Sequence, residues 1–115
     1  MAWQTLVSAE QVAAQLGDPR LLVFDCRYEL ARPEAGREAY LRGHLAGAIH
    51  ADLHHDLAGP TSPTSGRHPL PDPQVFAARL RRWGVDDDSL LLAYDDATSM
   101  WASRFWWMTA KWLGH

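Results

Sequence analysis

The stretch LLLAYDDATSMWASRFWWMTAKWL, residues 90–113, decides the fold. It predicts a short buried strand over residues 90–94, an acidic loop that opens with Asp95 and Asp96, and an apolar helix over residues 99–113. Open α/β sheets place their chemistry in such loops, at the C-terminal ends of parallel strands. Backbone N–H groups at the start of a helix favour an anion or a thiolate there. This loop instead opens with two carboxylates and contains no Cys, Lys or Arg.

The composition bounds the chain to one globular domain, because 115 residues with 47% hydrophobic and 22% charged side chains suffice for a single core. A net charge of −3 argues against a nucleic-acid partner. The single cysteine, Cys26, excludes an internal disulfide and a Cys-rich zinc site. Glu10 interrupts the apolar residues near the N-terminus, and the apolar runs are far shorter than the ~20 residues of a membrane span. We therefore expect a cytoplasmic protein without a membrane partner.

The first part of the chain predicts a helix followed by a buried strand. Ser8 and Gln11 have the spacing of a capping box, and Gly17 is placed to end the helix. The continuous apolar run at residues 21–24 is typical of a strand buried on both faces. Polar side chains in Asp25-Cys26-Arg27 follow at its C-terminal end.

The middle of the chain predicts two helices separated by a short strand and a long loop. We expect a helix over residues 34–41, a turn leading into a strand over residues 43–50, and a loop over residues 52–71. The pair Asp72-Pro73 then starts a helix that Gly84 ends. Helices that alternate with short apolar strands indicate an α/β fold with a parallel sheet. Because the chain stops after a helix, we expect one domain over residues 1–115, truncated at its C-terminus and lacking its final strand.

Two longer strings carry a resemblance to a known family: LVFDCR at residues 22–27 and YLRGHLAGAI at residues 40–49. In this order they resemble the rhodanese-like sulfurtransferases, over nearly the whole chain. Shorter strings resemble the first of the two tandem domains in thiosulfate and 3-mercaptopyruvate sulfurtransferases: ARP at 31–33, RHPLP at 67–71, YDD at 94–96 and RFWW at 104–107.

The resemblance implies a rhodanese-like fold, a parallel sheet with helices on both faces, and an enzyme that transfers sulfane sulfur from thiosulfate or 3-mercaptopyruvate to cyanide or a thiol. In active domains of the family a nucleophilic Cys opens the loop, and an Arg often closes it. Asp95 occupies the Cys position here, and the first Arg after it is Arg104. A carboxylate does not accept sulfane sulfur as a thiolate does, and its charge repels thiosulfate. We expect this chain alone to be inactive, to need no cofactor, and to meet donor and acceptor through a second, catalytic rhodanese domain.

The resemblance also assigns a candidate catalytic residue to the loop before the Asp72 helix. His68 matches a first-domain His proposed to assist proton transfer in mercaptopyruvate sulfurtransferases, a role suited to a side chain that titrates near neutral pH. His54 stands where relatives carry an Asp, which leaves Asp52 as the candidate partner of His68. A plain loop or interface role for His68 stays open.

The other candidate residues have structural interpretations. We expect Asp25, Arg27 and His44 to brace the loops at the end of the sheet, and Cys26 to be an inert, half-buried thiol. Met100 and Trp101 are candidates for an apolar wall that faces the partner domain. The cluster His50, His54, His55 and Asp56 lacks the spacing of a metal site, so we expect no metal.

Two other functional classes stay open from the sequence. A free-standing, non-catalytic rhodanese-like module would bind or regulate another protein, and the reading frame beyond His115 would distinguish it from half of an enzyme. A phosphatase-like relative is disfavoured, because that chemistry also needs a loop Cys and Arg. The sulfur donor and the acceptor are not specified by the residues.

Overall fold

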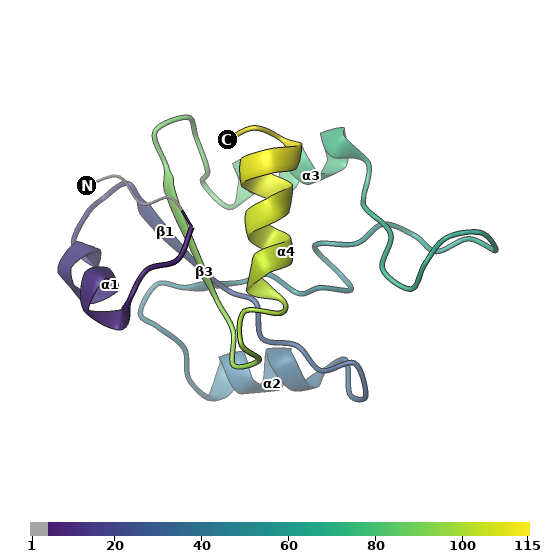
Figure 1. The fold of residues 1–115 in the computed structure, drawn as a ribbon, viewed down its shortest axis with the longest axis horizontal. Helices are drawn as coiled ribbons and strands as arrows, with labels where there is room; N and C mark the ends of the chain where they lie inside the picture. The colour runs from purple at the N-terminus through teal and green to yellow at the C-terminus, as the bar shows by residue number, and fades with distance from the viewer. Residues whose placement is uncertain (1–4) are drawn as a thin grey trace.

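The computed structural model describes residues 5–115 (Figure 1). Helices and strands alternate along the chain in the order α1 (Ala9–Gln15), β1 (Leu21–Asp25), α2 (Ala35–Arg42), β2 (Ile49–His50), α3 (Pro73–Arg82), β3 (Leu90–Tyr94), α4 (Ala102–Trp106) and the π-helix η1 (Trp107–Trp112). The three strands form one parallel sheet in the order β2-β1-β3. The expected α/β fold with a parallel sheet is confirmed.

The central strand β1 carries the core. Phe24 is fully buried and pairs with Ile49 on one side and Ala93 on the other. On the face of the sheet that it shares with those residues, its ring contacts Trp83 after α3 and Phe105 of α4, with ring centroids 5.4 and 4.5 Å apart. Helices α3 and α4 therefore cover this face, and the aromatic contacts join elements far apart in sequence.

The predicted starts of α1 and α3 are confirmed. Ser8 accepts a hydrogen bond from the backbone N–H of Gln11, whose side chain accepts one from the N–H of Ser8, so the capping box is complete. Asp72 caps α3 by accepting from the N–H of Gln74 at 2.8 Å. Gly84, with φ of +93°, lies directly after this helix in a conformation that favours glycine.

The last helix differs from its prediction in start and in type. It begins at Ala102 rather than at residue 99, since Thr98 and Ser99 have φ of 54° and 68°, outside the helical region. From Trp107 onward it is a π-helix, in which the Thr109 hydroxyl donates to the carbonyl of Phe105 at 2.9 Å. The Trp107 side chain of this helix is 42% exposed.

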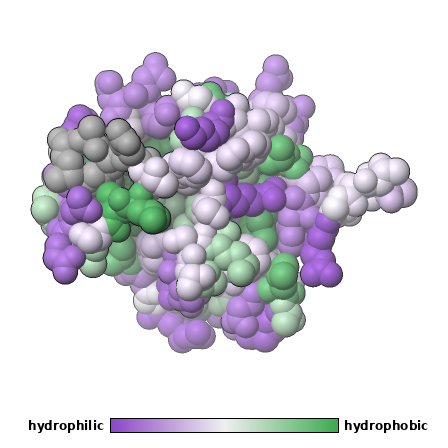
Figure 2. All heavy atoms as spheres, in the orientation of Figure 1, coloured by the Kyte–Doolittle hydropathy of each residue, from purple (hydrophilic) through white to green (hydrophobic). Residues whose placement is uncertain are grey.

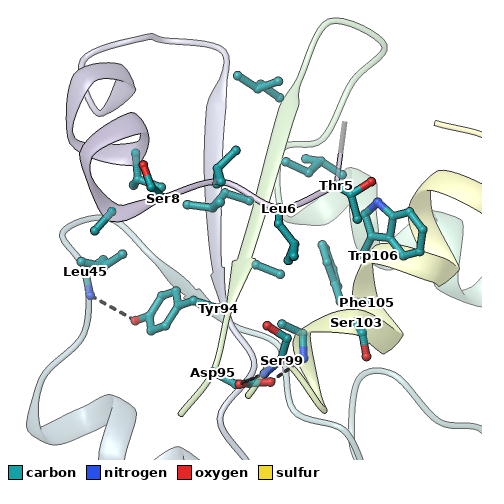
Figure 3. Close-up of a pocket in the computed structure, with 18 of the residues that line it drawn as sticks. Thr5, Leu6, Ser8, Leu45, Tyr94, Asp95, Ser99, Ser103, Phe105 and Trp106 are labelled. Atoms are coloured by element: carbon teal, nitrogen blue, oxygen red, sulfur yellow. Dashed lines mark hydrogen bonds between the residues drawn. The ribbon is translucent and has the colours of Figure 1, made fainter. Parts of the chain in front are cut away.

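The outer edge of β3 is unpaired within residues 5–115. Leu90 donates its N–H to the carbonyl of Arg20, just before β1, and Tyr94 accepts from the N–H of Cys26, just after it. Alternation along β3 therefore turns the backbone of Leu91 and Ala93 away from β1. A groove of about 640 Å³ runs along this strand between the N-terminal segment, α1 and α4 (Figure 3). Its apolar lining includes Leu6, Val12, Leu16, Leu92 and Trp106. The further strand expected at this edge stays a prediction.

The surface is mixed in polarity, and a long irregular loop joins β2 to α3. In Figure 2 the apolar patches on one face are separated by polar residues. The segment between β2 and α3 has no regular secondary structure, and part of it projects from the body (Figures 1 and 2). Among the described residues, no helix is both long and apolar enough to cross a membrane.

The open edge predicts self-association of the isolated chain, because unpaired strand edges and apolar grooves recruit further strands. We expect sedimentation velocity to show assembly that increases with protein concentration. Leu92→Lys places a charge in the groove and should reduce this assembly, whereas Leu41→Lys on the exposed side of α2 should not. A monomeric chain with a sharp, cooperative melt would contradict the prediction.

Candidate functional site

A buried carboxylate joins the C-terminal ends of β1 and β3. Asp25 is fully buried and accepts hydrogen bonds from the Arg27 guanidinium, one of them 2.6 Å from Nη2, and from the Tyr94 hydroxyl at 3.0 Å. Arg27 also donates to the carbonyl of Gly43, and the Tyr94 hydroxyl accepts from the N–H of Leu45. Burial alone would raise the pKa of Asp25, but the bonds from Arg27 and Tyr94 hold it below its usual value. The pair Asp25 and Arg27 thus ties the two strands to the turn after α2.

His44 lies in that turn and is exposed. Its ring stacks on Tyr40 with centroids 3.8 Å apart, and its Nδ1 is 2.7 Å from the carbonyl oxygen of the same residue. Because a carbonyl only accepts, Nδ1 donates. The Tyr40 hydroxyl in turn donates to the carbonyl of Ala48 at 2.6 Å. These contacts shape the turn between α2 and β2.

The loop after β3 folds around Asp95. One carboxylate oxygen accepts from the N–H groups of Ala97 and Ser99, both at 2.9 Å, and the other accepts from those of Trp101 and Ala102, both at 2.8 Å. Figure 3 shows this carboxylate beside the start of α4. Burial alone would raise the pKa of Asp95, but the four backbone hydrogen bonds lower it, so the side chain is ionised at neutral pH.

The position of Asp95 decides what the loop can do chemically. Its N–H groups already have an anion as their acceptor, supplied by the chain itself. An ionised carboxylate in this place adds negative charge to the loop and repels other anions. The only thiol, Cys26, is buried, and burial raises its pKa so that it stays protonated. The expectation of an inert thiol is consistent with this burial, although the side chain is fully rather than half buried.

The four backbone N–H groups that donate to Asp95 form a cradle for its carboxylate. Asp95→Asn should make the protein less stable than the unaltered chain, by an amount that depends on pH, because the amide nitrogen cannot accept from two of these N–H groups. We expect a loss of about 1–2 kcal/mol in the free energy of unfolding at pH 7. A carboxyl whose pKa is lowered by folding stabilises the fold above its unfolded pKa of about 3.9, and this contribution disappears as the pH falls through the lower folded value. Urea unfolding followed by tryptophan fluorescence should therefore show the two proteins converging below about pH 4. The exposed neighbour provides the control, Asp96→Asn, for which a similar loss would contradict the interpretation.

His68 lies in the long loop and faces residues from other elements. Its Nε2 is 3.5 Å from the Tyr28 hydroxyl, and the two rings meet edge to face with centroids 5.8 Å apart. The rings of His54 and His68 also meet edge to face, with centroids 5.9 Å apart. Burial lowers the pKa of His68, and the positive charges of Arg104 and Arg67 and the neighbouring His54 lower it further. The imidazole is therefore neutral at physiological pH and able to accept a proton.

Asp52, the expected partner of His68, forms its hydrogen bonds with neighbouring loop residues instead. Its carboxylate accepts from the backbone N–H of His55 at 2.8 Å, and its own N–H donates to the Asp56 carboxylate at 2.9 Å. No hydrogen bond joins Asp52 to His68 in the described part of the chain; Asp52 acts on it only as a nearby charge that favours the protonated form. Asp52 shapes the loop directly, and Tyr28 occupies the place beside His68.

From the sequence, Arg104 was only the first Arg after Asp95, with no predicted role. Its half-buried guanidinium donates to the carbonyls of Leu57 at 2.7 Å, His68 at 3.0 Å and Pro69 at 3.3 Å. Its charge is balanced by carbonyl dipoles, since no ion pair with a carboxylate forms among residues 5–115. Arg104 therefore fastens the loop that carries His68 to α4. A single Arg within an otherwise apolar helix was the one sequence signal for it.

The hydrogen bonds from Arg104 to the carbonyls of Leu57, His68 and Pro69 act as a clamp on the loop. We predict that Arg104→Met loosens the loop without unfolding the domain. Loss of ~1.4 kcal/mol of local stability would raise the open population about tenfold. Limited trypsin digestion should then cleave after Arg67 about tenfold faster than in the unaltered chain. Arg81→Met, on the exposed side of α3, is the matched control and should leave that cleavage rate unchanged. An unchanged rate in Arg104→Met would show that the loop does not depend on the clamp.

The two residues expected to face a partner domain differ in exposure. Met100 is 58% exposed, whereas Trp101 is half-buried and packs edge to face on Tyr28 with centroids 5.4 Å apart. The indole Nε1 of Trp101 is buried without a hydrogen-bond partner among the described residues. In the same part of the chain, no group of three or more His, Cys, Asp or Glu side chains is placed to hold a metal ion.

The fold and site define a small parallel α/β domain whose strand-end loop encloses its own carboxylate. The rhodanese-like domain family matches residues 8–115, and the chain belongs to this family. The recognition made from the LVFDCR and GHLAGA strings is confirmed.

Several relatives are sulfurtransferases. The chain is 44% identical over 115 residues to the probable 3-mercaptopyruvate sulfurtransferase of Pseudomonas aeruginosa, covering 99% of this chain and 40% of that protein. It is 38% identical over 107 residues to the putative thiosulfate sulfurtransferase SseB of Mycobacterium tuberculosis, covering 91% and 37%. The solved 3-mercaptopyruvate sulfurtransferase of Leishmania major superposes with a TM-score of 0.82 at 33% identity, over 91% of this chain and 29% of that one. The chain thus spans about two fifths of the length of these curated relatives.

Proposed function

We propose that this chain is the first, non-nucleophile domain of a tandem sulfurtransferase. The complete enzyme would move sulfane sulfur from thiosulfate or 3-mercaptopyruvate to a thiophilic acceptor such as cyanide or a thiol. The observation that carries the proposal is the Asp95 carboxylate, which fills the N–H cradle of the loop where an active domain presents its Cys. A second domain with a Cys-initiated loop would supply the nucleophile.

The lengths and names of the relatives support a tandem arrangement. Proteins named as 3-mercaptopyruvate and thiosulfate sulfurtransferases are more than twice as long as this chain. Small-molecule donor and acceptor would bind between the two domains, near the carboxyl ends of the strands. The exposed Met100 and the half-buried Trp101 lie at that end, and we assign them to the domain interface. The single thiol is buried and free, which suits a reducing, cytoplasmic compartment.

We assign His68 a proton-transfer role in the complete enzyme. A neutral imidazole with a pKa below its usual value accepts a proton at physiological pH and returns it to a product. Arg104 holds its backbone in place, and Asp52 contributes through its charge. This division of roles needs no metal and no cofactor.

A second candidate function is a free-standing rhodanese-like module that binds or regulates another protein. The observation in its favour is that the Asp95 loop is complete in itself, with all four hydrogen bonds formed within this chain. The DNA sequence downstream of the His115 codon distinguishes the two, since a Cys-bearing domain supports the enzyme and a stop codon supports the module.

The decisive assay measures thiocyanate formation from cyanide with each donor in turn. We expect the isolated chain to form none above background, with or without Cys26→Ser. In a polypeptide that continues into a Cys-bearing second domain, His68→Asn should lower kcat by about 100-fold, the usual contribution of a general acid or base. A measurable rate in the isolated chain that is lost in Cys26→Ser would overturn the proposal.

A further inference from the structure

His68 is held at two points by two different elements. Its backbone carbonyl accepts from Arg104 of α4 at 3.0 Å, while its ring meets Tyr28, which lies just beyond β1. The first contact fixes the loop, and the second involves the imidazole nitrogen Nε2 itself. The contact between the Tyr28 hydroxyl and Nε2 therefore bears on which ring nitrogen of His68 carries the proton.

Tyr28 is a rigid neighbour for this nitrogen. It is only 4% exposed, and its ring meets the rings of both His68 and Trp101 edge to face. Its hydroxyl is 3.5 Å from Nε2, at the long end of hydrogen-bond distances. Within residues 5–115 the hydroxyl has no other side-chain or backbone partner.

The direction of this hydrogen bond follows from the burial. If Nε2 carried the proton and donated it, the phenolic hydrogen of Tyr28, a residue only 4% exposed, would have no acceptor among residues 5–115, which is costly. Burial also raises the pKa of Tyr28, so the hydroxyl keeps its proton and remains a donor. The arrangement that satisfies both groups has the hydroxyl donating to an unprotonated Nε2.

We infer that Tyr28 is a positioning residue that selects the tautomer of His68, leaving the ring proton on Nδ1. Nε2 then keeps the lone pair that can accept a proton, and the Tyr28 hydroxyl orients that nitrogen, while Nδ1 keeps its own proton. The inference rests on the proposed function for its catalytic meaning only. The tautomer itself is a property of this chain.

Other charged groups around His68 affect its protonation but not the choice of nitrogen. Arg104 and Arg67 act as positive charges, Asp52 as a negative one, and His54 is the neighbouring imidazole. None of them donates a hydrogen bond to the His68 ring in the described part of the chain. Tyr28 is therefore the residue whose removal should move the proton between the two nitrogens.

The experiment is a long-range ¹H–¹⁵N NMR titration of the six histidines in the 115-residue chain. In the unaltered protein we expect the neutral His68 ring to carry its proton on Nδ1. Tyr28→Phe keeps the buried ring but removes the hydroxyl, so the predominant tautomer should switch to the one protonated at Nε2. The pKa of His68 should rise at the same time, since a donor to the neutral imidazole favours the neutral form.

Tyr40→Phe is the matched control, because it removes a hydroxyl that donates to Ala48 and lies beside other histidines. It should leave the tautomer of His68 unchanged. A His68 ring protonated at Nε2 in the unaltered chain, or the same tautomer before and after Tyr28→Phe, would overturn the inference. So would an equal change in both variants. The readout involves no sulfur transfer, so a catalytically silent His68→Asn would contradict the proposed function without affecting this result.

Discussion

The ion pair between Asp25 and Arg27 is the constraint on which the carboxyl end of the sheet depends. A carboxylate with no exposed surface is tolerated there only because a guanidinium, a backbone N–H and the hydroxyl of Tyr94 all donate to it. The same donors reach the turn after α2 and the end of β3. The loops that carry the candidate site therefore start from fixed points.

At the ends of β1 and β3, a carboxylate that is wholly or partly buried is stabilised in two different ways. Asp25 is neutralised by a cationic side chain, whereas Asp95 is stabilised by backbone dipoles alone. The second solution leaves net negative charge at the end of β3. Under the proposed function, the catalytic contribution of this domain therefore comes from the neighbouring loop of His68 and not from the loop of Asp95.

The sequence was sufficient wherever a feature depends on neighbouring residues. The capping box at Ser8 and the Asp72 cap are local hydrogen-bond patterns, and they were predicted at the correct positions. The start and type of the last helix were not, since they depend on the left-handed Thr98 and Ser99. The contacts of His68 with Tyr28 and Arg104 span 40 and 36 residues, so no spacing rule could reveal them. The resemblance supplied His68 itself, but only the folded chain shows what surrounds it.

The two-oxygen geometry of the Asp95 cradle has a consequence for substitution at this position. Each oxygen accepts from a separate pair of N–H groups, so the loop fits an acceptor with two atoms about as far apart as a carboxylate provides. A single sulfur atom at this position would leave one pair unserved, and the left-handed backbone at Thr98 and Ser99 would lose its compensation. Under the proposed function, Asp95→Cys alone would therefore not give a loop that holds a single sulfur atom, because the positions of its N–H groups match two oxygen atoms.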